Sequence, residues 1–173
     1  MESVKIVLLA LLAAVCYGVL HDQVTVRVCV EYFTVGHPPV FAANDPTLLA
    51  LGWGAVAAWW VGGLLGVPLA LCARLGSRPK LTAGQLLVPI GVQLAAVAAF
   101  ALAAGIAGYA AAKMGAVVLI GEWAARVPRE RHVVFIADLW AHGAAYASAA
   151  ITGLAVCGQT WARRGRLARE RTG

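Results

Sequence analysis

The sequence predicts an all-α membrane protein, a four-transmembrane-helix bundle with an extended, partly strand-like first extracytoplasmic loop. Of its 173 residues, 61% are hydrophobic and only 13% are charged, whereas about 25% of residues are charged in soluble domains. Four apolar stretches each reach the ~17–25 residues that a membrane-crossing helix needs. Nineteen glycines and many alanines favour close packing between such helices. The length fits a single transmembrane domain covering residues 1–173.

The first two spans are predicted over residues 4–20 and 46–75. The first resembles a signal sequence, but no small-residue cleavage site follows it, so we expect an uncleaved signal anchor. The second begins at Pro46, a residue that suits the first turn of a helix. Asn44 or Asp45 would then be its N-cap.

The third span is predicted over residues 86–112 and the fourth over 133–161. Small residues recur about one turn apart in the third span, at Gly105, Gly108 and Ala112. Such a stripe allows close contact with a neighbouring helix, either within the chain, in a homo-oligomer or with another membrane protein. Residues 114–131 form either a surface helix or an extension of the third span, and the pattern does not distinguish the two.

The distribution of positive charge predicts that both termini are cytoplasmic. With that orientation nine Lys and Arg residues lie inside: Lys5, Arg74, Arg78, Lys80, Arg163, Arg164, Arg166, Arg169 and Arg171. Five lie outside, namely Arg27, Lys113, Arg126, Arg129 and Arg131. The excess follows the positive-inside rule, so we expect a multi-pass membrane protein with both termini in the cytoplasm. The arginine tail indicates contact with the lipid bilayer, not with nucleic acid.

Residues 21–38 form the most distinctive segment. From Val24 to Glu31 every second residue is valine, and this period of two favours an extended, strand-like conformation. Its polar side would carry His21, Arg27, Cys29 and Glu31. If the first helix continues instead, Arg27 and Glu31 become an i,i+4 ion pair.

Titratable residues gather on the predicted outer side of the membrane. All four histidines lie there, together with six of eight carboxylates: Asp22, Glu31, Asp45, Glu122, Glu130 and Asp138. Asp138 and His142 are four residues apart, so they share a helix face, and an acid and an imidazole arranged in this way can bind a metal together.

We therefore predict an outward-facing site for a divalent transition metal, which would make the chain a metal-binding protein or a membrane-embedded metalloenzyme. The predicted ligands are His21, Glu31, Asp138 and His142, with His37 and His132 as further candidates. A mixed nitrogen and oxygen set suits zinc, iron, manganese or copper. If the protein is an enzyme, the candidates for positioning or acting on a substrate are Arg27, Glu31 and Tyr32.

Other interpretations of the same residues stay open. Each polar residue could serve only to form hydrogen bonds between helices. A non-enzymatic bundle could use histidines to hold a haem-type pigment, or could bind a protein partner. A proton or ion pathway is disfavoured because the inner halves of the spans carry no matching polar residues. The four cysteines contain no C-x-x-C pair, which disfavours a thiol–disulfide oxidoreductase.

The segment HDQVTVRVCVEYFTVGHP, from His21 to Pro38, resembles a signature of small four-span integral membrane proteins of bacteria. The similarity extends to residues 46–53 and to the region around Ala141 and His142. It implies the same bundle architecture and a location in the bacterial cytoplasmic (inner) membrane. It implies no activity, because that group has no established one.

Overall fold

The computed structural model of this chain describes residues 1–41 and 45–171, and the secondary structure they form is helical throughout. The long helices are α1 (Glu2–Val28), α3 (Pro46–Arg74), α4 (Leu87–Lys113) and α6 (His132–Glu170). The short ones are α2 (Val30–Thr34), α5 (Gly121–Arg126) and two 3₁₀ turns, η1 (Gly84–Leu86) and η2 (Arg129–Arg131). All four long helices, α4 counted with η1 and α6 with η2, are long and apolar enough to cross a membrane, which confirms the four-span bundle.

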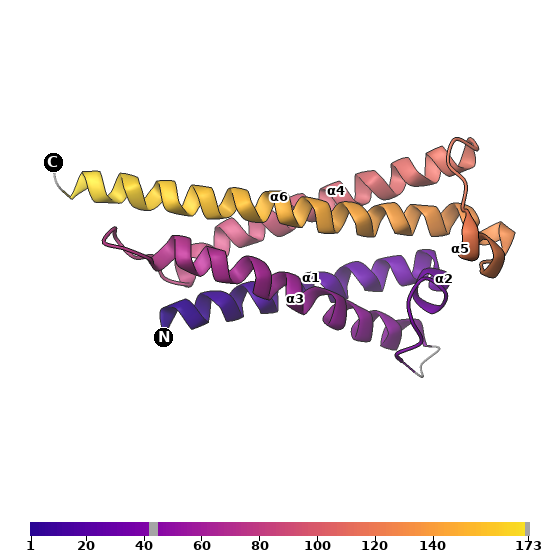
Figure 1. Cartoon of the computed structure of the whole chain (residues 1–173), viewed down its shortest axis with the longest axis horizontal. Coiled ribbons are helices and arrows are strands. Elements are labelled where there is room, and N and C mark those ends of the chain that lie inside the picture. Colours follow the sequence, from indigo (N-terminus) through magenta and orange to yellow (C-terminus); the bar gives the residue numbers. More distant parts are fainter. Residues whose placement is uncertain (42–44, 172–173) are drawn as a thin grey trace.

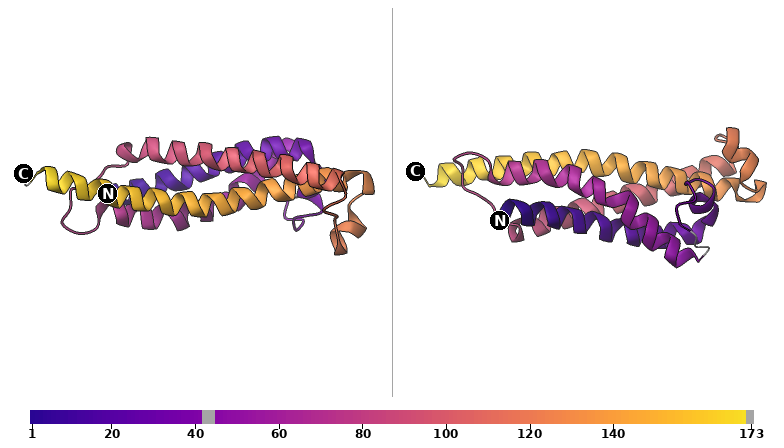
Figure 2. Two further views of the ribbon diagram at one scale, coloured as in Figure 1. Left: turned by 90° about the horizontal axis from the view of Figure 1, so that it is seen from above. Right: turned by 60° about the horizontal axis from the view of Figure 1, so that its bottom comes forward.

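The four long helices run side by side along the long axis of the molecule (Figures 1 and 2). They pack as two hairpins, α1 with α3 and α4 with α6, and the hairpins join mainly through α3 and α6. Both termini lie at one end, while α2 and α5 lie at the opposite end (Figure 1). We call the end with α2 and α5 the loop end.

Glycines allow the backbones of α1 and α3 to approach closely. A Cβ atom added at Gly54 would lie 2.6 Å from the Val19 Cα, and one added at Gly62 would lie 2.6 Å from the Leu11 Cα. Real Cβ atoms do not tolerate such distances, so these positions require glycine. In the other hairpin, Gly108 lies under the Trp140 ring, as the small-residue stripe of the third span predicted.

The prediction of a strand-like first loop is wrong. The helix α1 continues through Val24 and Val26 to Val28, and α2 begins two residues later. Between these two helices Cys29, with φ −148° and ψ 94°, is the one extended residue. A lone strand beside a bilayer would leave its backbone groups without partners, whereas a helix satisfies them internally. The alternating valines fit this helix because Val26 is buried while Val24 is exposed on the outside of the bundle.

The long helices coincide with the predicted spans, although α1 and α6 extend well beyond them. Asp45 is the N-cap of α3 and accepts a hydrogen bond from the Leu48 backbone N–H at 2.9 Å; Asn44, the alternative, lies outside the described residues. Residues 114–131 do not extend α4, which ends at Lys113 and is followed by a turn with Gly115 at φ +70°. This segment instead forms the short helix α5 and the turn η2.

Candidate metal centre

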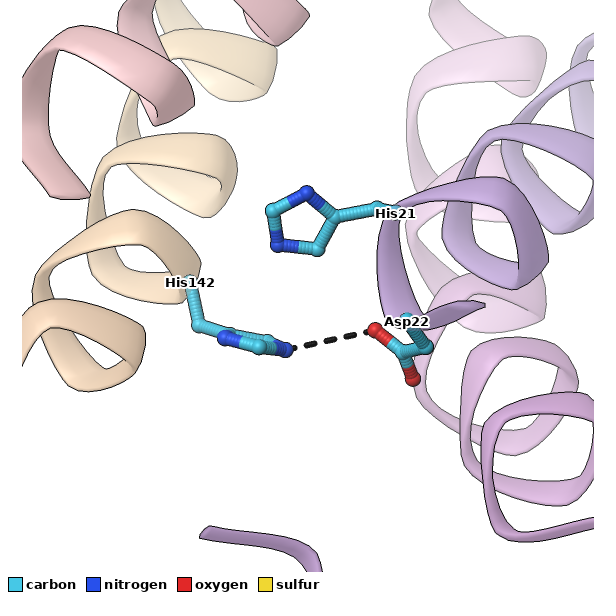
Figure 3. Close-up of side chains that lie close together, drawn as sticks. All are labelled: His21, Asp22 and His142. Carbon is cyan, nitrogen blue, oxygen red and sulfur yellow. Dashed lines mark hydrogen bonds and ion pairs between the residues drawn. The ribbon is translucent and has the colours of Figure 1, made fainter. Parts of the chain in front are cut away.

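Three side chains from two helices that are far apart in the sequence meet in the bundle near the loop end: His21 and Asp22 on α1, and His142 on α6 (Figure 3). Each offers one potential ligand atom, and these atoms lie within 4.8 Å of one another. The His142 Nε2 and Asp22 Oδ1 atoms are 3.2 Å apart. The rings of His21 and His142 meet edge to face, with centroids 4.6 Å apart. Asp22 and His142 are only 5% and 8% exposed, so water competes little for them.

The orientation of His142 is fixed by its own helix. Its Nδ1 lies 2.9 Å from the Asp138 backbone carbonyl. A carbonyl oxygen only accepts, so Nδ1 carries the hydrogen and donates it. In the neutral ring Nε2 then has a free lone pair, and that lone pair faces the Asp22 carboxylate. Two lone pairs at this distance repel unless a proton or a cation lies between them. A backbone carbonyl that fixes one ring nitrogen while the other faces a ligand position is common among metal-binding histidines.

His21 provides a second imidazole whose hydrogen-bonding capacity is unused. Its Nε2 atom is buried and has no hydrogen-bond partner among the described residues. The same holds for the hydroxyl of Tyr17, whose ring stacks on the His21 ring with centroids 5.6 Å apart. A buried polar atom without a partner is costly, so the nitrogen of His21 is available for a ligand.

Aromatic residues around α2 cover the loop-end side of this group. The Tyr32 ring stacks on His142 with centroids 4.4 Å apart. His37 packs against Trp53 at 4.4 Å and its Nδ1 donates to the Tyr32 backbone carbonyl at 2.9 Å. Burial lowers the pKa of His37 and raises that of the Tyr32 hydroxyl. Both groups are therefore neutral near pH 7, and they screen the site from water without adding charge.

Of the predicted ligands, the structure brings His21 and His142 together. Asp138 is 2% exposed, but its carboxylate lies outside the group of three, and its Oδ2 has no hydrogen-bond partner in the described parts of the chain. It contributes through its backbone carbonyl instead. The i,i+4 spacing predicted that the Asp138 carboxylate acts together with the His142 ring, but the contact that forms comes from the backbone of Asp138.

The Glu31 carboxylate lies in a separate cluster. It accepts a hydrogen bond from Nε of Arg131 at 3.0 Å and one from Sγ of Cys29 at 3.3 Å. Burial raises the pKa of Glu31, but the bonds from its own backbone N–H, from Arg131 and from Cys29 outweigh that effect and hold it below its usual value. Burial also raises the pKa of the Cys29 thiol to about 12, so this thiol stays protonated.

The other candidates also have partners of their own. Nε2 of His132 donates to the Val127 backbone carbonyl at 3.0 Å, and His132 is outside the three-residue group, as is His37. Arg27 bonds to the Gln23 side chain at 2.7 Å and to the Thr47 hydroxyl at 3.0 Å, so it does not pair with Glu31 as the helical alternative predicted. Tyr32 is the one candidate for substrate contact that borders the three-residue group.

Asp22 is the residue that the sequence did not single out as a ligand. The strand-like interpretation placed it on the same side as the valines, away from His21 and Glu31. A helical interpretation gives a usable signal, because Asp22, Thr25 and Val26 then share one face, and all three are buried. A carboxylate on the buried face of a membrane helix is expected to have a partner.

A cavity of about 120 Å³ extends from this group between the two hairpins. Its walls come from α1, α3, α4 and α6, and His21, Asp22, Tyr32, His37 and His142 line one end. Most of the remaining wall consists of alanine, glycine and branched aliphatic side chains. The group therefore opens onto an apolar space inside the bundle.

Comparisons of the chain with protein-family models, with curated proteins and with solved structures found no match.

Proposed function

We propose that this chain is a multi-pass membrane protein that binds a divalent transition metal through His21, Asp22 and His142. The proposal rests chiefly on one observation: three potential ligand atoms from α1 and α6 lie within 4.8 Å of one another. Two nitrogens and one carboxylate oxygen suit zinc, iron, manganese or copper. The Asp22 carboxylate takes the place of Glu31 and Asp138 in the predicted ligand set.

The distances fit a metal that Asp22 and His142 share. Ligand atoms at ~2.0–2.2 Å from a tetrahedral zinc ion lie about 3.4 Å apart, and the His142 Nε2 to Asp22 Oδ1 distance is 3.2 Å. A cation at this position would replace the lone-pair repulsion with two bonds. His21 would complete the set through a modest rotation of its ring, which is not held by a hydrogen bond at Nε2.

Three protein ligands leave a fourth position for water or another oxygen ligand, as in many catalytic zinc sites. A metal held there supplies a Lewis acid that polarises an oxygen ligand. The Tyr32 ring and the apolar walls of the cavity keep bulk water away from that position. The low dielectric strengthens the attraction between the cation and Asp22.

We place the site toward the outer leaflet of a bacterial cytoplasmic membrane. The support is the excess of Lys and Arg at the end that holds both termini, which the positive-inside rule puts in the cytoplasm. The loop end, with α2 and α5, would then face outward. The resemblance of residues 21–38 to bacterial four-span proteins agrees with this location.

Elemental analysis of protein purified in detergent without chelators tests the metal site. We expect about one metal ion per chain in the wild type, and loss of the metal in Asp22→Asn and His142→Ala. Asp138→Asn is the matched control, because it replaces an equally buried carboxyl group while keeping the backbone carbonyl that orients His142. That variant should keep its metal.

A wild type that holds no metal, even after incubation with Zn²⁺ or Co²⁺ and removal of the free ion, contradicts the proposal. Equal loss from the Asp138 and Asp22 variants contradicts the ligand assignment. A visible absorption band of the purified protein that His142→Ala removes would instead support the haem-type pigment.

A further inference from the structure

The cavity beside the candidate metal centre is lined along several turns of α1 and of α6. On α1 its lining residues run from Ala10 to Asp22, and on α6 from His142 to Gly153. At ~1.5 Å per residue these segments are about 16–18 Å long. That length is close to half the ~30 Å hydrocarbon thickness of a bilayer, and so to the depth that one lipid tail spans.

The two ends of the cavity differ in chemistry. One end holds the three potential metal ligands and the unpartnered hydroxyl of Tyr17. The other end is bounded by Leu69 and Ile90, which belong to the buried core of the bundle. Between the ends the polar side chains are Gln93, whose amide donates to the Ala149 backbone carbonyl at 3.4 Å, and Tyr146, whose hydroxyl donates to the Ala57 backbone carbonyl at 3.4 Å. An apolar space of this kind does not hold ordered water well, whereas a hydrocarbon chain would contact apolar walls along its length.

The charge of the proposed metal ion would favour an acidic headgroup at the polar end. A divalent cation with one carboxylate ligand, Asp22, and two neutral imidazoles keeps a net charge of +1 and an open position. A second carboxylate would neutralise it and supply an oxygen ligand. The hydroxyl of Tyr17, which is buried and lacks an acceptor among the described residues, offers a hydrogen bond to the same group.

We propose that the cavity binds a single-chain lipid carboxylic acid, with its carboxylate on the metal held by His21, Asp22 and His142 and its tail along α1 and α6 toward Leu69 and Ile90. This inference rests on the proposed metal site and names the class of ligand that the site takes. It predicts that the headgroup and the tail contribute separately to binding: the headgroup through the metal, and the tail through the apolar walls.

The Co²⁺-loaded protein in detergent separates these contributions. The visible absorption of Co²⁺ changes when an oxygen ligand enters its coordination sphere, so titrations with dodecanoate and with acetate report carboxylate binding at the metal. We expect dodecanoate to saturate at a concentration at least about tenfold below acetate, since a difference of 1.4 kcal/mol suffices for that factor and each buried methylene is worth up to ~0.8 kcal/mol.

A larger side chain in the cavity should remove only the contribution of the tail. Ala149 lines the cavity, while the neighbouring Ala150 is exposed and does not. In Ala149→Leu we expect the affinity for dodecanoate to fall about tenfold, toward that of acetate, because the added methyl groups overfill the space. Binding of Co²⁺ and of acetate should not change. In Ala150→Leu all three affinities should equal those of the wild type.

The outcomes separate the two proposals. Metal bound without a dodecanoate advantage, or with an advantage that Ala149→Leu leaves intact, overturns the lipid inference and leaves the metal site standing. A wild type that binds no Co²⁺ overturns both. Metal binding together with a dodecanoate advantage that is lost in Ala149→Leu and kept in Ala150→Leu supports both.

Discussion

Arg164 is the most completely buried charged side chain described in this protein, at 0% exposure, and its replacement should destabilise the fold strongly. It lies in the last third of α6, and its guanidinium donates to four backbone carbonyls around the C-terminal end of α3: Cys72 at 2.7 Å, Leu75 at 2.8 Å, Pro79 at 2.8 Å and Arg78 at 3.0 Å. The carbonyls at a helix end have no partners within the helix. Arg164 therefore caps α3 from another helix and joins the two hairpins.

The expected loss of unfolding free energy follows from the number of hydrogen bonds that Arg164 donates. In Arg164→Ala four carbonyls lose their donor, and an unsatisfied buried acceptor costs about 1–3 kcal/mol. Water can reach part of the 75–80 turn, where several residues are exposed, so the lower value applies and the expected loss is about 4 kcal/mol. Arg164→Lys should lose about half as much, because an ammonium group cannot reproduce the planar fork of donors.

The free energy of unfolding can be measured along an SDS titration in mixed micelles. The buried thiol of Cys157, 7% exposed, becomes reactive toward a maleimide only when the helices separate. Arg166→Ala is the matched control, since it removes the same charge from the same helix but from an exposed position. Equal midpoints for the Arg164 and Arg166 variants would refute the capping role of Arg164.

Two further predictions use the same titration. Gly54→Ala should destabilise by about 1–3 kcal/mol, because its Cβ would lie 2.6 Å from the backbone of α1; Gly63→Ala, with no atom within 4 Å, should not, and a harmless Gly54 substitution would argue against the tight α1–α3 seam. Glu31→Gln should cost about 1 kcal/mol at pH 7 through its ion pair with Arg131. The pKa of Glu31 is held below its usual 4.5 in the folded protein. The contribution of the ion pair to stability is therefore present above pH 4.5 and is lost as the pH falls through the lower folded value. If the wild type stayed more stable than Glu31→Gln in strong acid, that result would contradict the pairing.

The four spans could be predicted because a membrane helix is defined by local properties. Length and apolar composition suffice to locate one, and the structure has a helix at each predicted position. The conformation of the segment after His21 could not be predicted in this way, because alternating valines fit two conformations. On a strand they line one face, whereas on a helix they spread around it, and the alternation alone does not identify which face packs. The deciding fact is nonlocal: Val26 packs against Leu49 and Trp53 of α3.

The proposed ligand group could be predicted only in part, for the same reason. The spacing of four within α6 predicted that the Asp138 carboxylate acts together with the His142 ring, but the contact is made by the Asp138 backbone carbonyl. The partner of the other ring nitrogen comes from α1, 120 residues away in sequence. Periodicity says which residues share a face of one helix, and it carries no information on which faces of two helices meet. Glu31 is a second example. The helical alternative predicted Arg27, one turn away, as its partner, yet the structure pairs Glu31 with Arg131.

The strongest competing interpretation is that Asp22 and His142 form a structural ion pair between hairpins. Such a pair would consist of two groups that satisfy each other, and a third polar group beside it would gain nothing. Here His21 adds a buried nitrogen without a partner among the described residues, directly beside the pair. The hairpins already join through α3 and α6 and through Arg164, so an additional polar contact between α1 and α6 is not needed to hold them together. Three polar side chains that face an apolar cavity are costly if their role is only to hold the helices together. A bound cation is the occupant that would satisfy all three.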